Sequence, residues 1–378
     1  MIFLRLLNPL GLDFRVYYEA AWMIIRGLNP YRGILISAFP FNYPPPAFLF
    51  LFPLGLLAYR EASIIWNLLS VISLVIAIFL IFRVAFPTGK KLFFLIFLFL
   101  FTLPFFPVKF NIGMGQINNF ILLFSVLSLF LYQRNHKLLS AFFLAFATGI
   151  KLAPVIFVFY FLINKDYRQV LRFLICLLVV FALPIVLVPL SFQTDYFLKV
   201  LPLSFNLNAK DWYYNQSVWG LAARSFSRPP VIYIFSYFFT AVFLEVTYWR
   251  GRKIPGLRAL GAVACLYLLI HPIALQHYFG FTIIPFIILT ADFLKKGTIP
   301  EWFFLFIAYF LTAVNIKNFA SVPAEYKIIL SHDFFGVLLL WLLLLFKEKA
   351  VKIVGWLWVS GITAGYILIL LCRGRICF

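Results

Sequence analysis

Charged residues are scarce in this chain. Only 12% of its 378 residues are Asp, Glu, Lys or Arg, whereas 64% are hydrophobic. A soluble globular domain has about 25% charged and about 45–50% apolar residues. A soluble fold would leave far too much apolar surface in water, so this class is excluded. The composition predicts an all-α polytopic membrane protein with a single membrane domain over residues 1–378.

Acidic residues and cysteines are also few. The chain has 12 Asp and Glu against 32 Lys and Arg, which gives a net charge of +20. In a soluble protein this excess would suggest a nucleic-acid partner. Here the basic residues lie in short loops between apolar runs, so the positive-inside rule explains them and we expect no nucleic acid. The 4 cysteines show no metal-ligand spacing.

Apolar runs long enough to cross a bilayer follow one another along most of the chain. A transmembrane helix needs about 20 such residues. Two longer runs, 138–163 and 258–294, are interrupted at Lys151 to Pro154 and from His271 to about His277, and each predicts a helical hairpin. All runs together predict about twelve spans. The other candidate spans are 62–83, 91–108, 117–132, 172–190, 229–249, 301–316, 333–346 and 353–372.

Basic clusters between the runs set the expected orientation. Even numbers of spans separate them, so all of them can face the cytoplasm. The extracytoplasmic face then carries loops 13–44, 191–228, 271–277 and 317–332. Segment 45–59 is short and rich in proline, and we expect a re-entrant or interfacial element there. If it spanned the membrane instead, loop 13–44 would lie in the cytoplasm.

The first of these loops opens with acidic and aromatic residues. Helical spacing over 14–26 puts Tyr17 on an apolar face, which predicts an interfacial amphipathic helix with Asp13 at its N-cap. Asp13 either only caps this helix or takes part in chemistry. Glu19 follows on the same helix. Tyr43 precedes three prolines, which predict a rigid helix entry.

Amides and histidines lie where apolar runs begin or break. Gln116 and Asn118 follow two glycines that allow close approach of the backbone. These amides contact either a ligand or a neighbouring helix. His271 and His277 flank a break, and they contact a phosphate or hydroxyl or simply end a helix. No nearby carboxylate or cysteine completes a metal site with them.

Lys151 lies between two apolar half-runs. An ionisable residue in such a position is energetically costly and suggests a function. In the expected topology it lies at an outer hairpin tip. There it either meets a lipid-linked phosphate as a point charge or extends to the membrane interface.

The large loop 191–228 combines aromatic rings with amides. This combination is typical of sugar-facing surfaces and also of the aromatic belts at membrane interfaces. Its polar candidates are Asn215, Gln216 and Arg224, and its aromatic candidates are Trp212, Tyr213 and Trp219.

Taken in order, these motifs resemble glycosyltransferase family 87. That family resembles the polyprenyl-phosphate-mannose-dependent α-mannosyltransferases of bacteria, which have the GT-C membrane fold. The resemblance spans residues 13 to 278. Its pieces are Asp13-Phe14-x-Val16-Tyr17-Tyr18-x-Ala20-Ala21, Gly27-x-x-Pro30-Tyr31, Tyr43-Pro44-Pro45, Gly115-Gln116-x-Asn118, Lys151-x-x-Pro154, Asn215-Gln216-Ser217 with Gly220 and Arg224, and Pro272-Ile273 with His277.

The resemblance implies a GT-C-type glycosyltransferase with short amphipathic helices in its extracytoplasmic loops. It would transfer a hexose, expected to be mannose, from a polyprenyl-phosphate sugar to a glycolipid or glycan hydroxyl with inversion at the anomeric carbon. Asp13 would be the general base, while Lys151, Arg224 and His277 would face the donor phosphate or sugar. The remaining substrate-binding candidates are Tyr17, Glu19, Tyr43, Gln116, Asn118, Asn215, Gln216 and His271.

The expected setting follows from the same resemblance. The site would lie on the extracytoplasmic face of the plasma membrane, with membrane lipids, the lipid-linked donor and the acceptor as partners. We expect neither a metal nor another cofactor. Family members are similar to other GT-C enzymes in having a span before the aspartate, whereas only Met1 to Leu12 precede Asp13. We therefore expect either further upstream sequence or an N-terminus that reaches the outer face without that span.

Two other functions compete with glycosyl transfer. A secondary transporter or lipid flippase would need repeats with paired broken helices at the midplane. The two interrupted runs fit this loosely, but the other segments do not form two similar halves. A non-catalytic scaffold for envelope assembly is the second alternative, and it would not need the carboxylate of Asp13.

Overall fold

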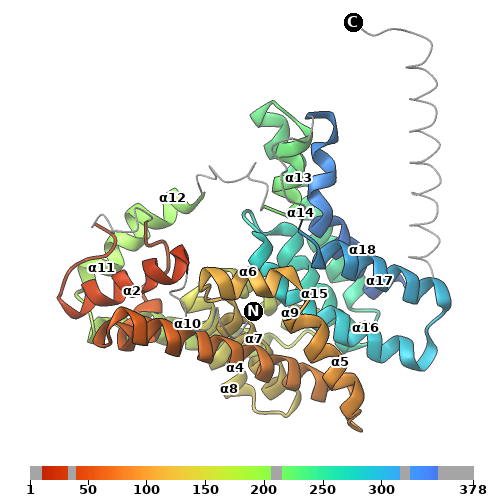
Figure 1. The fold of residues 1–378 in the computed structure, drawn as a ribbon, viewed down its shortest axis with the longest axis horizontal. Helices are drawn as coiled ribbons and strands as arrows, with labels where there is room; N and C mark the ends of the chain where they lie inside the picture. Colours follow the sequence, from red (N-terminus) through yellow and green to blue (C-terminus); the bar gives the residue numbers. More distant parts are fainter. Residues whose placement is uncertain (1–10, 33–39, 206–214, 316–323, 348–378) are drawn as a thin grey trace, which may run out of the picture.

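The computed structural model describes residues 11–32, 40–205, 215–315 and 324–347. In these ranges every regular element is a helix, and one isolated bridge pairs Asn215 with Leu275. The all-α prediction is thus confirmed for the described part of the chain (Figure 1). The predicted span 353–372 and parts of loops 13–44, 191–228 and 317–332 lie outside the described residues.

Most helices follow the predicted apolar runs closely, but the predicted span 91–108 is divided between α5 and α6. Those of the first half are α2 (Leu12–Ile25), α3 (Ala47–Leu51), η1 (Phe52–Leu56), α4 (Tyr59–Ala85), α5 (Lys91–Thr102), α6 (Phe106–Met114), α7 (Asn118–Gln133), α8 (Lys137–Ile150), η2 (Ala153–Phe157), α9 (Val158–Ile163), α10 (Tyr167–Ala182) and η3 (Leu183–Val186). Those of the second half are α11 (Leu190–Asp195), η4 (Tyr196–Val200), α12 (Leu201–Phe205), α13 (Val218–Ser225), α14 (Pro229–Gly251), α15 (Gly256–Ile270), η5 (Gln276–Thr282), α16 (Ile283–Lys296), α17 (Ile299–Ala313), η7 (Ala324–Ser331) and α18 (His332–Phe346).

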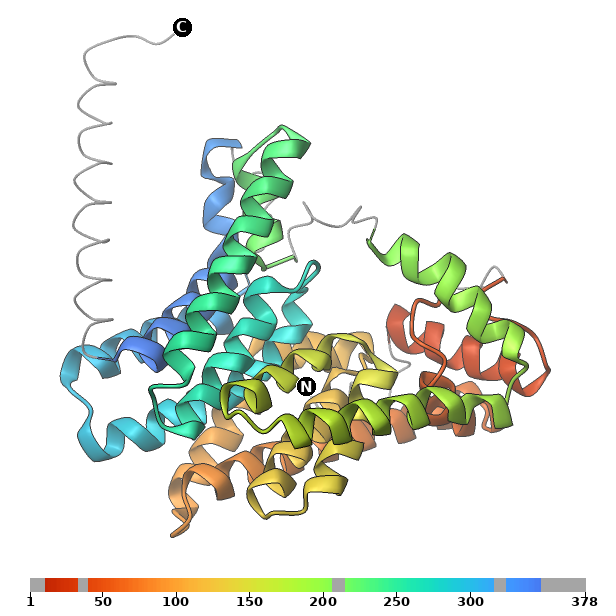
Figure 2. The same ribbon diagram turned by 180° about the vertical axis from the view of Figure 1, so that it is seen from behind.

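Most of these helices belong to two packed groups. In the first, α7 packs on α4 and α8, and α8 packs on α10. In the second, α15 packs on α14, α16 and α18, and α18 packs on α17. The groups meet where η5 contacts α6 and α7 and where α15 contacts η2. Figures 1 and 2 show α2 and α11 at one end of the molecule and α17 and α18 at the other.

Several helices are long and apolar enough to cross a bilayer. There are 5 such helices in the described part, or 6 if α5 and α6, which meet at a bend of 59°, form one broken span. Shorter apolar helices of 10–17 residues accompany them. The chain is therefore a multi-pass membrane protein, whereas the count of about twelve spans, the orientation and the GT-C fold remain predictions.

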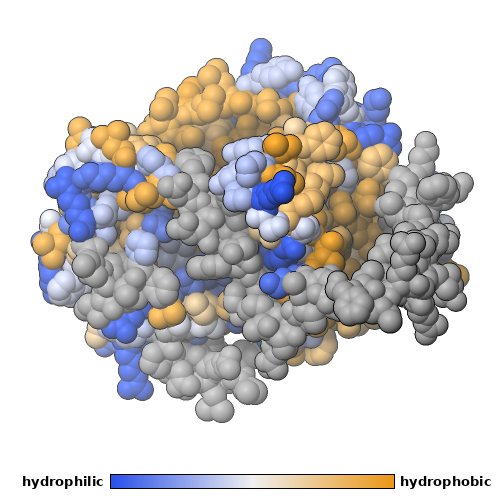
Figure 3. All heavy atoms as spheres, turned by 90° about the horizontal axis from the view of Figure 1, so that it is seen from above, coloured by the Kyte–Doolittle hydropathy of each residue, from blue (hydrophilic) through white to orange (hydrophobic). Residues whose placement is uncertain are grey.

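The candidate spans differ in how much of their surface reaches the outside. Only 17% of the apolar window of α14 is buried within the protein, against 89% for the segment Gln276–Lys296. Exposed apolar side chains form broad areas of the visible surface in Figure 3, between patches of polar side chains. Exposed helices such as α14 thus supply surface for lipid, while η5 and α16 form the interior.

Two predicted helix breaks are confirmed, and segment 45–59 does not form a span. Segment 45–59 forms only the short elements α3 and η1 before α4 begins, too short for a span. The run 138–163 breaks after Ile150, where the backbone of Lys151 is extended. The run 258–294 breaks between Ile270 and Gln276.

The start of α13 requires a glycine, which gives a test of the packing. An added Cβ at Gly220 would lie 2.0 Å from the carbonyl oxygen of Asn215, whereas nothing lies within 4 Å of one at Gly113. We expect Gly220→Ala to destabilise the protein by about 1–3 kcal/mol, because the backbone must shift. Gly113→Ala, also within a helix, should stabilise it by up to about 1 kcal/mol through helix propensity. Apparent melting temperatures of the two purified variants in detergent would check this, and a Gly220→Ala protein as stable as wild type would contradict it.

Candidate functional site

Asp13 lies inside α2 and does not cap it. The helix begins two residues earlier than predicted, because Gly11 is the N-cap and its carbonyl already accepts the N–H of Arg15. The prediction of Asp13 as N-cap is therefore wrong. Its carboxylate is half-buried and forms a hydrogen bond with Gln116 instead. A purely capping role for Asp13 is thereby excluded.

A chain of hydroxyls connects α2 to the segment before α3. Tyr17, on the predicted buried face of α2, donates from its hydroxyl to Oε1 of Gln116 at 3.0 Å. The hydroxyls of Tyr17 and Tyr43 lie 2.7 Å apart. Since Tyr17 gives its proton to Gln116, Tyr43 donates to Tyr17. The backbone carbonyl of Tyr43 accepts from the hydroxyl of Tyr31 at 2.7 Å.

The turn that presents Gln116 depends on a glycine. Gly115 ends α6 with a left-handed backbone, φ 69°, which costs an L side chain energy but costs glycine little. The carbonyl of Gly115 accepts from Nε1 of Trp66 at 2.8 Å, and Trp66 is buried in α4. This fixed turn carries Gln116, which lies two residues before Asn118, the first residue of α7.

Lys151 is buried at the end of α8, with 9% of its surface exposed. Its Nζ donates to Oδ1 of Asn118 at 2.8 Å. It also lies 3.8 Å from the ring centroid of Tyr278 and 5.8 Å from that of Tyr43. The lysine therefore does not extend to a surface but lies within a cage of one amide and two aromatic rings.

Burial moves the pKa values of the acid and the base in opposite directions. Burial raises the pKa of Asp13, against the effects of the Gln116 hydrogen bond and of the charge on Lys151. Burial lowers the pKa of Lys151 to about 7, against the effect of Asp13. The two groups are thus close enough to affect each other and are both brought nearer to neutral pH.

The two predicted histidines lie beside this cage. The buried ring of His277 stacks against Tyr278 with centroids 5.1 Å apart, and its Nδ1 has no hydrogen-bond partner among the described residues. Its backbone carbonyl accepts from Nδ2 of Asn118 at 3.3 Å. Nδ1 of His271 accepts the N–H of Ile273 at 3.0 Å. Burial and the charge on Lys151 lower the pKa of His271 to about 3, so this ring is neutral.

The break between α15 and η5 is held by polar residues of the large loop, namely Asn215, Gln216 and Arg224. Asn215 donates to the carbonyl of Pro272 at 3.1 Å and accepts the N–H of Ala274 at 3.1 Å. Gln216 and Arg224 reach the segment before α18, as described below. Through these contacts the three candidates hold the loop that carries the histidines.

Other predicted residues lie apart from the cage. Glu19 forms an ion pair of 2.9 Å with Arg15 on α2, near Tyr59. The ring of Trp219 packs edge-on against Tyr237. Trp212 and Tyr213 lie outside the described residues.

Asp195 joins the two predicted outer loops. Its carboxylate accepts hydrogen bonds from Asn29 and Arg32 of the first loop and pairs with Lys199 at 2.7 Å. Hydrogen bonds from Arg32 and Lys199 lower the pKa of Asp195 to about 2. The adjacent ring of Tyr196 packs on Tyr31, so this ionic cluster also holds the Tyr31–Tyr43 hydrogen bond in place.

Sequence reasoning missed the role of Tyr278. Its ring is the nearest aromatic face to the ammonium of Lys151. The chain has 19 Tyr, and only the position directly after His277 distinguishes this one. The pairing of Tyr278 with Lys151 joins two breaks far apart in sequence, which no local pattern indicates.

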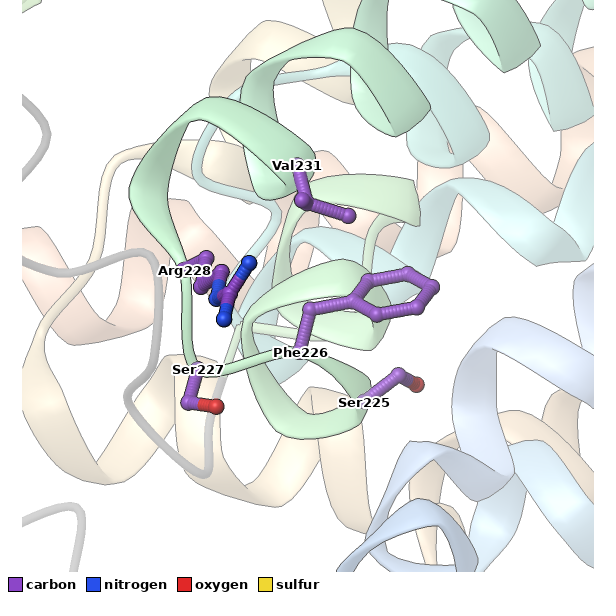
Figure 4. A pocket seen from close by; sticks show the side chains of 5 residues that line it. All are labelled: Ser225, Phe226, Ser227, Arg228 and Val231. Atoms are coloured by element: carbon purple, nitrogen blue, oxygen red, sulfur yellow. The ribbon is translucent and has the colours of Figure 1, made fainter.

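One surface hollow lies away from the cage, and the described residues contain no cluster of metal ligands. A hollow of about 200 Å³ lies at the turn between α13 and α14, lined by Ser225, Phe226, Ser227, Arg228 and Val231 (Figure 4). It contains none of the predicted site residues. Within the described ranges no three His, Cys, Asp or Glu side chains gather as metal ligands would, and independence from metal stays a prediction.

Comparison with known proteins gives the family. The sequence model described as glycosyltransferase family 87 matches residues 41–272, which include Tyr43, Gln116, Asn118, Lys151 and Asn215. Searches of curated proteins and of solved structures gave no match. The match covers more than half of the 378 residues. The chain therefore belongs to glycosyltransferase family 87 and is a membrane glycosyltransferase.

Proposed function

We propose that this chain transfers a hexose, mannose in the first instance, from a polyprenyl-phosphate sugar to a hydroxyl of a glycolipid or glycan. The observation that carries the proposal is that a half-buried carboxylate, Asp13, and the buried amine of Lys151 lie close enough for each to shift the pKa of the other. Glycosyl transfer from a phosphodiester needs a base for the incoming hydroxyl and a cation for the leaving phosphate. The family assignment favours this reaction over transport of a lipid or solute.

In the proposed reaction Asp13 accepts the proton of the acceptor hydroxyl while the oxygen of that hydroxyl bonds to the anomeric carbon. The bond between that carbon and the phosphate oxygen breaks, and polyprenyl phosphate leaves from the opposite face. One displacement inverts the configuration, so no second carboxylate is needed as a nucleophile. The raised pKa of Asp13 suits a base that works near neutral pH.

Lys151 would stabilise the negative charge that develops on the departing phosphate. Lys151 can also donate to a phosphate, because Asn118 accepts only one of the three ammonium hydrogens. His277 would add a hydrogen bond from its Nδ1, which has no partner in the described part of the chain. We place the reaction at the extracytoplasmic membrane boundary, with the prenyl chain in lipid, on the basis of the loop topology expected from the positive-inside rule.

Replacing the base tests the mechanism. We expect Asp13→Asn to lower kcat by about 10²–10⁴-fold, because proton transfer in the transition state is lost while the shape of the side chain is kept. The assay would use purified protein in lipid, labelled polyprenyl-phosphate mannose and a panel of glycolipid acceptors. Glu61→Gln, at an exposed acid in the first turn of α4, is the matched control. Full transfer by Asp13→Asn would remove this residue from the mechanism.

The pKa shifts predict a bell-shaped dependence of kcat/KM on pH. Activity should fall on acidification once the raised pKa of Asp13 is crossed, because a protonated carboxyl accepts no proton. It should fall again above about pH 7, where Lys151 of the free enzyme loses its charge. Lys151→Arg should remove the alkaline limb, since arginine stays charged. An alkaline limb that persists unchanged in Lys151→Arg, with exposed Lys91→Arg as control, would exclude Lys151 as its source.

Two substitutions at Tyr278 separate the ring from the hydroxyl. Tyr278→Phe keeps the aromatic face over Lys151 and should retain kcat/KM within about threefold, whereas Tyr278→Leu should lose about 2–30-fold, the equivalent of a cation–π contact of about 0.5–2 kcal/mol. In Tyr278→Leu the alkaline limb should also move to lower pH, because the charged form of Lys151 is less stabilised. The pH profiles of both variants would check this, and equal loss in both would assign the effect to the hydroxyl.

A further inference from the structure

A second buried acid lies behind the histidine loop. Asp333, in the first turn of α18, is fully buried, and it is one of only 12 acidic residues in the chain. Burying a carboxyl group away from water is costly unless it forms compensating hydrogen bonds. The proposed mechanism makes no use of Asp333, so its burial needs another explanation.

Asp333 contacts the first residue of η5. Nε2 of Gln276 donates to Oδ2 of Asp333 at 2.9 Å, and both side chains are fully buried. Among the described residues, the other oxygen of each group, Oδ1 of Asp333 and Oε1 of Gln276, has no hydrogen-bond partner. The carboxyl and the amide therefore depend on each other for their hydrogen bonding.

From Gln276 a continuous path leads to the cage. His277 follows Gln276 directly, and its carbonyl accepts from Nδ2 of Asn118 at 3.3 Å. Oδ1 of the same amide accepts from Nζ of Lys151 at 2.8 Å. Asn118 is thus oriented by His277 at its nitrogen and presents its oxygen to Lys151.

The start of α18 is itself held in place. Nε2 of Gln216 donates to the carbonyl of Leu330 at 2.7 Å, and Nε of Arg224 donates to Oγ of Ser331 at 2.9 Å. Arg224 also donates to the carbonyl of Asn215 at 3.0 Å. Because these bonds fix the segment that precedes Asp333, the carboxyl is a firm point of attachment for Gln276.

We propose that Asp333 is a positioning residue for Lys151. Through Gln276 it sets the place of the His277 carbonyl, which orients Asn118 and so the ammonium. The consequence for catalysis rests on the proposed function, in which Lys151 stabilises the leaving phosphate. The positioning of Lys151 by itself does not depend on that function.

An exchange of the two partners tests the pairing. Gln276→Glu alone sets two carboxyls against each other, and we expect kcat to fall by about tenfold or more while the KM for the acceptor changes little. Adding Asp333→Asn restores an acid facing an amide and should bring kcat back to within about threefold of wild type. Asp333→Asn alone leaves two amides that still bond to each other and should be mild.

A labelling experiment reads the position of Lys151 without any turnover. A small acylating reagent is applied to the purified protein in lipid, and the modification of Lys151 is followed by mass spectrometry relative to exposed Lys109 on α6. In Gln276→Glu we expect Lys151 to react several-fold faster, because it loses its contact with Asn118. The exchanged pair should return its rate to that of wild type.

Glu301→Gln is the matched control, because Glu301 is another fully buried acid, on the neighbouring helix α17, where it caps the N–H of Thr298. It should lower the melting temperature and leave the labelling of Lys151 unchanged. The proposal is overturned if Lys151 reacts equally in wild type and Gln276→Glu, or if the exchanged pair stays as impaired as Gln276→Glu. If wild type transfers sugar but the labelling does not respond, the proposed function stands and the positioning falls. If the labelling responds but wild type transfers no sugar, the positioning of Lys151 stands and the proposed function falls.

Discussion

The buried ammonium of Lys151 is the constraint on which the rest of the site depends. Removing such a charge from water costs several kcal/mol unless polar groups replace the water. The structure supplies an amide oxygen from α7, an aromatic face from η5 and, through space, the carboxylate of α2. Lys151 also follows the last residue of α8, where the helix dipole favours a cation. Because these groups come from separate elements, the charge is compensated only when α2, α7, α8 and η5 meet at one place.

The non-helical breaks after α8 and α15 also lie at the site around Lys151. At membrane depth, non-helical backbone is tolerated only where other protein groups or water satisfy it. At the break after α15, the carbonyl of Pro272 and the N–H of Ala274 bond to the side chain of Asn215, and the carbonyl of Ala274 bonds to the backbone of Gln216. The polar residues of the large loop therefore serve the backbone of the histidine loop. Their effect on chemistry would pass through the position of His277.

The sequence predicts what is local. The apolar face of α2, the short elements at 47–56 and the break after Ile150 follow from spacing and proline, and all are present. The first residue of α2 is not predictable from local sequence. The N–H of Gly11 donates to the carbonyl of Gly113, about a hundred residues away, and Gly11 is the N-cap at which the helix starts. The contacts of Tyr278 and Asp333 escaped prediction for the same reason, since each depends on a partner far along the chain. Candidate residue types could be identified, but not which of them share a cage.

The coupling between Asp13 and Lys151 has a consequence for the order of events in the proposed reaction. In the structure each charge offsets part of the pKa shift that burial imposes on the other group. A bound phosphodiester adds a negative charge near Lys151. This charge stabilises the ammonium and offsets its effect on Asp13, so the pKa of Asp13 rises further. The carboxylate then becomes a stronger base at the moment when the donor is in place. As the proton moves to Asp13, its negative charge disappears while the departing phosphate gains a second negative charge, so the summed charge around the ammonium stays the same. In a site of low dielectric, this conservation of local charge avoids the large cost of creating an unpaired ion during the reaction.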